Sequence, residues 1–370
     1  MTKPKAKLEP ATFAQLPGWR DDDHLAAFKA FLKSCDKLIA KGAGNRSGKG
    51  RKAALIEVCK AAKEVEKPTR VSAKVFFEAR FTPHRVIHAD THGLLTGYFE
   101  PVLNGSREPH GNFRVPIYKR PPDLVNVVEE TQRAAKSDGL THLRKTKTGT
   151  EPFFTRAEIE QGALKGKGLE LLYLDDAVDA FFLHVQGSGR INMTDGSVVR
   201  INYDGKNGYP YTSIGRYLTA KGLFPADKMS MQAMGRWLRA DPERARQVMW
   251  QNASFIFFRE LKGHDADGPL GALGIPLTSG RSLAVDTAYH ELGLPVYVAA
   301  PKLTHATAKG GFRRLMIAQD VGSAIKGPER GDIYFGSGER AGRLAGTTKH
   351  PGNFYVLLPA PWPKTRKAAG

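Results

Sequence analysis

Three aspartates lie where a carboxyl group can be presented to a substrate. Asp286 and Asp320 each follow a short apolar run, and Asp332 begins one directly after a glycine. Apolar surroundings raise the pKa of a carboxyl group, which suits it to acid catalysis. Because Asp and Gly are both common turn residues, each aspartate taken singly is more simply explained by a turn.

Short strands separated by turn residues surround these aspartates. From about residue 71, β-branched and aromatic runs alternate with Gly, Pro, Asn and Asp, a pattern typical of barrels and sandwiches. We expect strands at 93–100, 115–118, 180–185, 197–203, 254–259, 283–285, 295–299, 315–318, 332–335 and 353–358. Helices are expected at 155–166, 213–222 and 228–250.

The N-terminal part of the chain predicts a pair of helices. Apolar residues recur at three- and four-residue steps over 24–40 and 52–63, with a Gly/Ser/Lys-rich break between them. Cys35 and Cys59 each lie on an apolar stripe, so they can meet as a disulfide in an oxidising compartment or remain two buried thiols. With only two cysteines, a cysteine-rich zinc site is excluded.

The charge of the chain indicates an anionic partner. The formal net charge is +19, and such a field speeds the encounter with negative surfaces. The basic residues are scattered and match no nucleic-acid motif, which disfavours nucleic acid. An acidic membrane surface, an anionic cell-wall polymer and a merely basic protein remain open. No apolar run is long enough to span a bilayer, and no secretory h-region follows the basic N-terminus.

Taken together, the aspartates resemble a known pattern. Asp286, the stretch 320–327 and Asp332 resemble the 3D domain, which is named for three aspartates. Further stretches resemble, in the same order, motifs of the membrane-bound lytic murein transglycosylase A (MltA) family: 96–101, 182–189, 203–208 and 271–278. The resemblance covers about residues 80–358.

Two features depart from the family pattern. The loop 328–331 is one residue longer than the commonest spacing, which leaves Glu329 as a rival acid. The segment 288–293 replaces the Pro-Leu-Gly-Thr that sometimes follows the first aspartate.

The resemblance implies a mainly β fold. It comprises a double-psi β-barrel domain with an inserted smaller β-barrel domain, and the glycan would lie in a groove between them. The helical hairpin adds an N-terminal segment. We expect the helical segment at 1–70, the double-psi (3D) domain at 71–110 with 245–360, and the inserted domain at 111–244.

The resemblance also implies a single catalytic acid, Asp332. In lytic transglycosylases the muramyl C6 hydroxyl attacks its own C1, which closes a 1,6-anhydro ring as the bond from N-acetylmuramic acid (MurNAc) to N-acetylglucosamine (GlcNAc) breaks. The tethered nucleophile replaces a water-activating base. Asp332 would act first as acid and then as base, with Asp320 and Asp286 as structural or electrostatic supporters.

Six residues in glycine-bounded motifs are candidates for glycan binding. They are Tyr98, Glu100, Gln186, Ser188, Lys206 and Tyr209. Turn support is the alternative for each, and Glu100 is equally suited to pairing with an arginine. His184 is interpreted as a core histidine within a strand. We expect neither a metal nor a cofactor.

Two other functions remain open at this stage. One is a non-catalytic, expansin-like polysaccharide-binding module, and the other is an ordinary glycoside hydrolase that uses Asp332 with Glu100. The expected partner is peptidoglycan, and the expected state is a monomer in the periplasm whose leader precedes this sequence. Outer-membrane association and envelope protein partners are left open.

Overall fold

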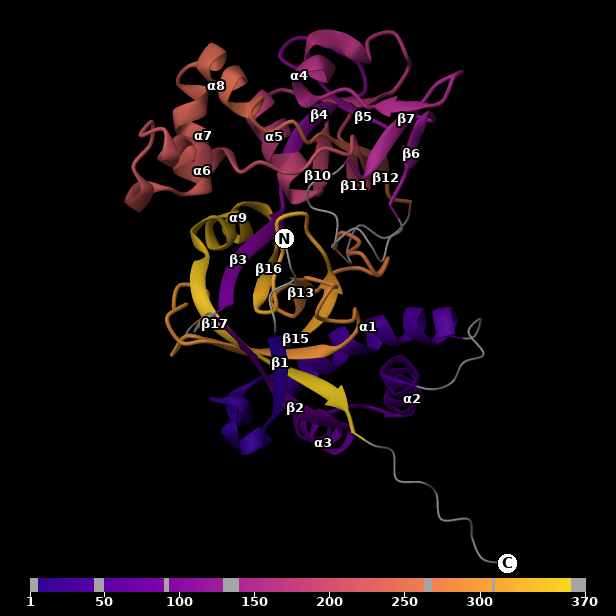
Figure 1. Ribbon diagram of the computed structural model, residues 1–370, viewed down its shortest axis with the longest axis vertical. Coiled ribbons are helices and arrows are strands. Elements are labelled where there is room, and N and C mark those ends of the chain that lie inside the picture. The colour runs from indigo at the N-terminus through magenta and orange to yellow at the C-terminus, as the bar shows by residue number, and fades with distance from the viewer. Residues whose placement is uncertain are drawn as a thin grey trace, which may run out of the picture. The chain divides into compact units, whose positions relative to one another are not determined.

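The chain folds into two compact units. The computed structural model describes residues 6–42, 50–89, 93–128, 140–262, 268–307 and 310–360, and Figure 1 labels its elements. Unit 1 comprises Met1–Thr96, Leu270–Tyr334 and Thr348–Gly370, and unit 2 comprises Gly97–Pro269 and Phe335–Thr347. Within the described ranges, no helix has the length and apolar character needed to cross a membrane.

Unit 1 is built on a closed β-barrel. Its strands are β1 (Ala6–Pro10), β2 (Phe81–His88), β3 (Gly93–Glu100), β13 (Ser282–Val285), β14 (Pro295–Ala300), β15 (Phe312–Asp320), β16 (Arg330–Ser337) and β17 (Lys349–Pro359). The sheet order is β1-β2-β17-β14-β15-β13-β16-β3, and β17 also pairs with β3. This extra pairing closes six strands into a ring, and the long β17, one of the six, is visibly curved (Figure 1). Strands β3 and β16 each begin in unit 1 and end in unit 2.

Successive side chains along each strand point alternately into this barrel and away from it. Leu95, Leu283 and Phe354 are fully buried and lie around Gly331. A Cβ atom at Gly331 would lie 2.6 Å from the Phe354 ring, so only glycine lets the ring fill this part of the interior. Asp332 follows Gly331 on β16 and therefore projects from the opposite, outer face.

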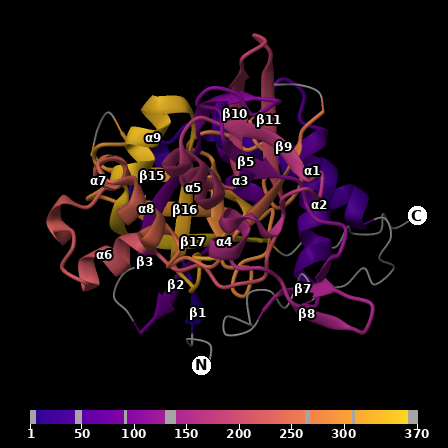
Figure 2. The ribbon, with the colours of Figure 1, turned by 90° about the horizontal axis from the view of Figure 1, so that it is seen from above.

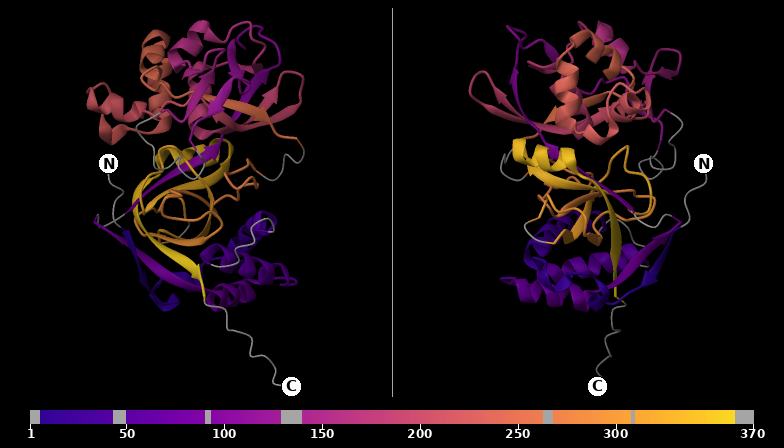
Figure 3. Two further views of the ribbon diagram at one scale, coloured as in Figure 1. Left: turned by 45° about the vertical axis from the view of Figure 1, so that its right-hand side comes forward. Right: turned by 90° about the vertical axis from the view of Figure 1, so that its left-hand side faces the viewer.

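Three helices pack together in unit 1, and both views in Figure 3 show them grouped. They are α1 (His24–Gly42), α2 (Arg51–Lys63) and α3 (Arg70–Arg80), preceded by the 3-10 turns Phe13–Gln15 and Trp19–Asp21. Cys35 on α1 and Cys59 on α2 lie at disulfide distance, with their Cα atoms 4.9 Å apart, which confirms that the two cysteines meet. The buried pair of Arg281 with Asp22, at 2.9 Å, ties the N-terminal segment to the barrel.

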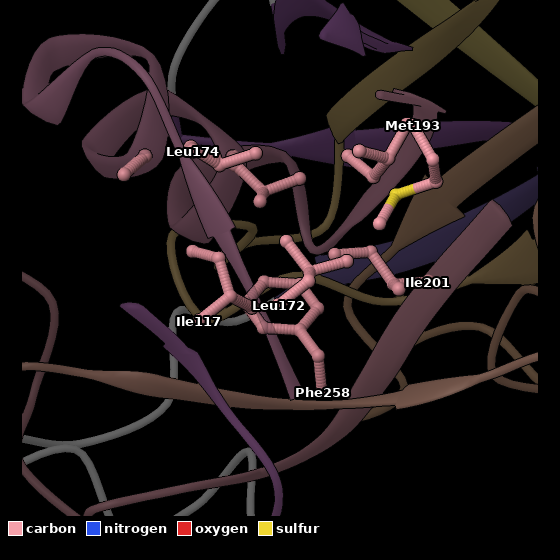
Figure 4. Close-up of a cluster of buried hydrophobic side chains, with 9 residues drawn as sticks. Ile117, Leu172, Leu174, Met193, Ile201 and Phe258 are labelled. Carbon is pink, nitrogen blue, oxygen red and sulfur yellow. The ribbon is translucent and has the colours of Figure 1, made fainter. Parts of the chain in front are cut away.

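Unit 2 contains a second barrel. Its strands are β4 (Val102–Ser106), β5 (Val115–Tyr118), β9 (Glu170–Leu174), β10 (Ser188–Met193), β11 (Val198–Lys206) and β12 (Ile256–Glu260). Their order is β12-β11-β10-β4-β9-β5, and a bridge between Lys119 and Phe258 brings the two edges together. Figure 4 shows the apolar side chains of its core, including Ile117, Leu172 and Ile201. A separate small sheet contains β6 (Leu124–Asn126), β7 (His142–Lys145) and β8 (Thr150–Pro152).

Unit 2 also contains helices, one of which occupies residues where the sequence predicted a strand. They are α4 (Arg156–Glu158), the π-helix η4 (Ile159–Ala163), α5 (Ala177–Gln186), α6 (Ile214–Ala220), the 3-10 turn Ala226–Lys228, α7 (Met231–Arg239), α8 (Pro242–Met249) and α9 (Gly338–Thr347). The strand expected at 180–185 is wrong, because these residues lie within α5. The helix expected at 228–250 is two helices, since Asp241 caps α8 and Pro242 begins it. Figure 2 shows α6, α7 and α8 side by side.

The expectation of a mainly β fold is confirmed by the sheets of both units. The double-psi connection and the domain limits stay predictions.

Candidate active site

The outer face of the unit 1 barrel carries a hydrogen-bonded acid. Thr96 on β3 donates a hydrogen bond from Oγ1 to Oδ1 of Asp332 at 2.5 Å. Arg330, two residues before Asp332 on the same strand, donates from Nη2 to the Thr96 hydroxyl at 2.9 Å. Within the described part of the chain, Oδ2 of Asp332 has no hydrogen-bond partner. One carboxyl oxygen is thus held by the protein, and the other is left for a ligand.

The surroundings of Asp332 favour its protonated form. Burial raises the pKa of this carboxyl group above the ordinary aspartate value, while Arg330 and the Thr96 hydrogen bond act in the opposite direction. The residue is nevertheless only half-buried, so part of its surface remains accessible. An acid that holds its proton to higher pH and is still accessible is suited to protonating a leaving group.

Asp286 shapes the loop that leads to Asp332. Its Oδ1 accepts a hydrogen bond from the backbone N–H of Ala288 at 3.0 Å, and its Oδ2 accepts one from Gly327 at 2.8 Å. His290 contacts the carbonyl oxygen of Pro328 through Nε2 at 2.6 Å, which fixes the same loop. Both carboxylate oxygens of the buried Asp286 are therefore engaged by backbone N–H groups.

Asp320 lies two strands away from Asp332. Ala284 on β13 is in register with Asp320 on one side and with Asp332 on the other. Two strand spacings separate the aspartate Cα atoms by about 10 Å. The Oδ1 atom of Asp320 accepts a hydrogen bond from the N–H of Ala272 at 3.0 Å, which holds a neighbouring loop.

Glu329 is committed to structural contacts. Its side chain is 1% exposed and forms ion pairs with Arg85 and with His88, whose Nε2 lies 2.9 Å from Oε2. The backbone N–H of Phe354 also donates to its Oε1 at 2.6 Å. These contacts favour Asp332 over Glu329 as the acid.

Glu100, a glycan-binding candidate, is fully buried in unit 2. Its carboxylate lies 2.6 Å from Nε of Arg200 and accepts a hydrogen bond from the Ser337 hydroxyl. The sequence left open whether Glu100 binds glycan or pairs with an arginine, and the structure shows the pair with Arg200. Glu100 is therefore not a free second carboxyl group.

The other binding candidates also belong to unit 2. Gln186, at the end of α5, accepts a hydrogen bond from the Phe99 N–H at 3.0 Å. Ser188 is buried at the start of β10. Tyr209 is half-buried, and burial raises the pKa of its phenol. Lys206 ends β11, and Tyr98 lies in β3.

His184 is a buried core residue, as expected, although it lies on helix α5. Its Nδ1 is 3.2 Å from Nη2 of Arg156, a buried residue that also donates to the carbonyl oxygens of Asn252 and Ser254. Burial, assisted by the charge of Arg156, lowers the pKa of His184 well below the ordinary value. The imidazole is therefore neutral at physiological pH.

Sequence reasoning missed Thr96 and Arg330 as members of the site. Thr96 begins the motif 96–101 and Arg330 lies in the loop 328–331, but only the pairing of β3 with β16 makes them neighbours. It also missed Asn207, whose amide donates to the carbonyl oxygens of Phe154 and Ala253 and holds two loops together. No cluster of three or more metal-binding side chains occurs among the residues that the structure describes.

Comparisons with known proteins agree with this architecture. The chain matches the family model of the MltA specific insert domain over residues 94–259 and that of the 3D domain over residues 281–358. It is 36% identical over 280 residues to the membrane-bound lytic murein transglycosylase A of Vibrio cholerae, covering 73% of this chain and 68% of that protein. The corresponding protein of Escherichia coli K12 is also 36% identical over 280 residues, covering 74% and 68%.

Solved structures are similar over nearly the whole chain. A membrane-bound lytic murein transglycosylase from Agrobacterium tumefaciens has a TM-score of 0.85 at 36% identity, covering 95% of this chain and 98% of that one. MltA from Neisseria gonorrhoeae, in a monoclinic crystal form, has a TM-score of 0.78 at 35% identity, covering 96% of each. E. coli MltA with bound chitohexaose has a TM-score of 0.66 at 29% identity, covering 98% and 94%. The present chain belongs to the MltA family of lytic transglycosylases.

Proposed function

We propose that this protein is a peptidoglycan lytic transglycosylase that uses Asp332 as its single acid and base. It cleaves the β-1,4 bond between MurNAc and GlcNAc and leaves a 1,6-anhydromuramyl end. The observation that carries the proposal is the raised pKa of Asp332 together with its unengaged Oδ2 atom. The curated relatives, which are named lytic murein transglycosylases, support the same activity.

The reaction proceeds in two proton transfers at one carboxyl group. Protonated Asp332 gives its proton from Oδ2 to the glycosidic oxygen as the C1–O bond breaks. The resulting carboxylate then takes the proton of the muramyl C6 hydroxyl, whose oxygen forms the new bond to C1. The Thr96 hydrogen bond and the charge of Arg330 stabilise the carboxylate between the two transfers.

The engagement of the other carboxyl groups supports a one-acid mechanism. A hydrolase with two catalytic carboxylates needs both of them near the scissile bond. Glu100 is paired with Arg200, Glu329 with Arg85 and His88, and Asp286 with backbone N–H groups. A tethered C6 hydroxyl needs no second base.

A digest of purified sacculi tests the proposal. Mass spectrometry of the products should show muropeptides with anhydro ends, which lack the water that a hydrolase adds. The Asp332→Asn variant should produce none and should still sediment with sacculi. Reducing muramyl ends as the only products would refute the lyase. A wild-type protein that binds sacculi without cleaving them would indicate the expansin-like module instead.

Glycan contacts in unit 2 are proposed for Tyr98, Lys206 and Tyr209, which keep accessible surface. Gln186 and Ser188 support the local backbone and are proposed as secondary contacts. Alanine variants of Tyr98 and Tyr209 should raise KM for glycan strands. An unchanged KM in both would remove them from the binding surface.

The periplasm is the proposed location. Peptidoglycan lies in the cell envelope, and a cysteine pair at disulfide distance suits an oxidising compartment. Cys35 and Cys59 of protein purified from the periplasm should react with a thiol reagent only after reduction. Free thiols in that protein would contradict the disulfide.

A further inference from the structure

The register of the unit 1 barrel places a row of side chains on either side of Asp332. Lys349 on β17 is in register with Thr96 on β3, and Thr96 is hydrogen-bonded to Asp332. On the other side, Ala284 is in register with both Asp332 and Asp320. Residues directly opposite each other in neighbouring strands project to the same face. These five residues, which we call the acid row, therefore share the outer face of the barrel.

Lys349 is the uncommitted cation of this row. Its residue is exposed, and it forms no ion pair with any carboxylate in the described ranges. Arg330, by contrast, donates to the carbonyl oxygen of Gly331 at 2.7 Å and to the Thr96 hydroxyl at 2.9 Å. The Arg330 guanidinium is thus used to hold the site, whereas the Lys349 ammonium group can meet an incoming charge.

The spacing along the row suits a substrate that lies across the strands. Lys349 is two strands from Asp332, so their Cα atoms are about 10 Å apart. The charge of Lys349 does not contribute to the pKa of Asp332, whose causes are burial, Arg330 and Thr96. The ammonium group therefore lies too far away to act on the acid and close enough to contact a group that the substrate carries beside the scissile bond.

We infer that Lys349 forms a carboxylate-binding subsite that recognises the acidic groups attached to the muramyl residue. This inference rests on the proposed function, because it concerns what binds next to Asp332. Intact glycan strands carry carboxylates on their stem peptides, and strands stripped of stems by an amidase carry the lactyl carboxylate instead. Both sources offer a carboxylate group, and most of the excess positive charge of this chain lies in unit 1.

The experiment compares the kcat/KM of four full-length proteins on matched substrates. The proteins are the wild type, Lys349→Gln, Lys349→Arg and the control Lys29→Gln, which removes an exposed, unpaired lysine from helix α1. The substrates are soluble stem-bearing strands, amidase-treated strands, and stem-bearing strands whose carboxylates have been converted to methylamides. Asp332→Asn is run on each substrate.

We expect Lys349→Gln to lower kcat/KM about fivefold on carboxylate-bearing strands and to leave methylamidated strands unchanged. An exposed ion pair contributes up to about 1 kcal/mol, which corresponds to that factor. Lys349→Arg and Lys29→Gln should behave as the wild type. A loss on stem-bearing strands alone assigns the contact to the stem, and a loss on stripped strands alone assigns it to the lactyl group.

Two results would overturn the subsite. One is equal activity of Lys349→Gln and the wild type on every substrate, and the other is an equal loss on charged and methylamidated strands. Neither result contradicts the proposed function as long as Asp332→Asn is inactive. Full activity of Asp332→Asn would refute the proposed role of Asp332 as the acid, independently of the results for the Lys349 variants.

Discussion

The hydrogen bond from Thr96 to Asp332 offers a direct test of how the acid is tuned. Thr96→Val removes the hydroxyl and keeps the shape of the side chain. The hydroxyl stabilises the carboxylate, so its loss should raise the pKa of Asp332 further. The alkaline limb of the kcat/KM profile reports the proton on the free enzyme's acid. This limb should therefore move to higher pH.

The size of the shift follows from the strength of the bond. A hydrogen bond to a charged group contributes about 1.5–3 kcal/mol, and one pKa unit corresponds to about 1.4 kcal/mol. Because Asp332 is only half-buried, water replaces part of the lost contact and the lower end applies. We expect an upward shift of about one unit. The plateau rate should fall severalfold, since a weaker acid transfers its proton less readily.

The assay is the release of anhydro-muropeptides from soluble strands as a function of pH. Thr96→Ser is the matched control, because serine keeps a hydroxyl that can reach Oδ1 of Asp332 and Nη2 of Arg330. Its alkaline limb should coincide with that of the wild type. A limb in Thr96→Val that stays in place or moves to lower pH would refute the reasoning.

Three further predictions concern stability. Asp332→Asn should raise the melting temperature near neutral pH and give no gain below pH ~4, because the raised folded-state pKa of Asp332 penalises only the charged form; a gain that persists in acid would contradict this. Gly331→Ala should lower the free energy of unfolding by about 1–3 kcal/mol through overpacking against Phe354, whereas Gly215→Ala, with no neighbour closer than 3.8 Å, should cost little. Glu329→Gln should lower the free energy of unfolding by about 3 kcal/mol, because it leaves Arg85 without its buried partner. Equal stability of this variant and the wild type in denaturant titrations would show that the pair is solvated.

The strands that carry the acid could be predicted from the sequence, because short β-branched runs between turn residues mark them. Strand β3 matches its expected range, 93–100, and Asp332 lies on the predicted strand that became β16. The partners of the acid could not be predicted in the same way. Thr96 is 236 residues from Asp332, and Arg200 is 100 residues from Glu100. Both pairs depend on how strands that are distant in the sequence are aligned side by side. Local sequence patterns carry no information about this alignment.

The error at 180–185 has an identifiable cause. The segment is apolar on nearly all sides, so its periodicity does not separate a buried strand from a buried helix. The flanking residues held the missing signal. Asp176 accepts a hydrogen bond from the N–H of Asp179 as the N-cap, and Gly187 ends the helix in the left-handed conformation.

The order in which the chain enters the two units has a consequence for biosynthesis. The chain leaves unit 1 after Thr96, returns at Leu270, leaves again after Tyr334 and returns at Thr348. Closure of the barrel by β17 thus waits for nearly the last described residues, and contacts between such distant segments form slowly. A chain that ends before β17 carries Asp332 on a barrel that is still open. Closure of the barrel that carries Asp332 therefore depends on a segment that is synthesised after the aspartate itself.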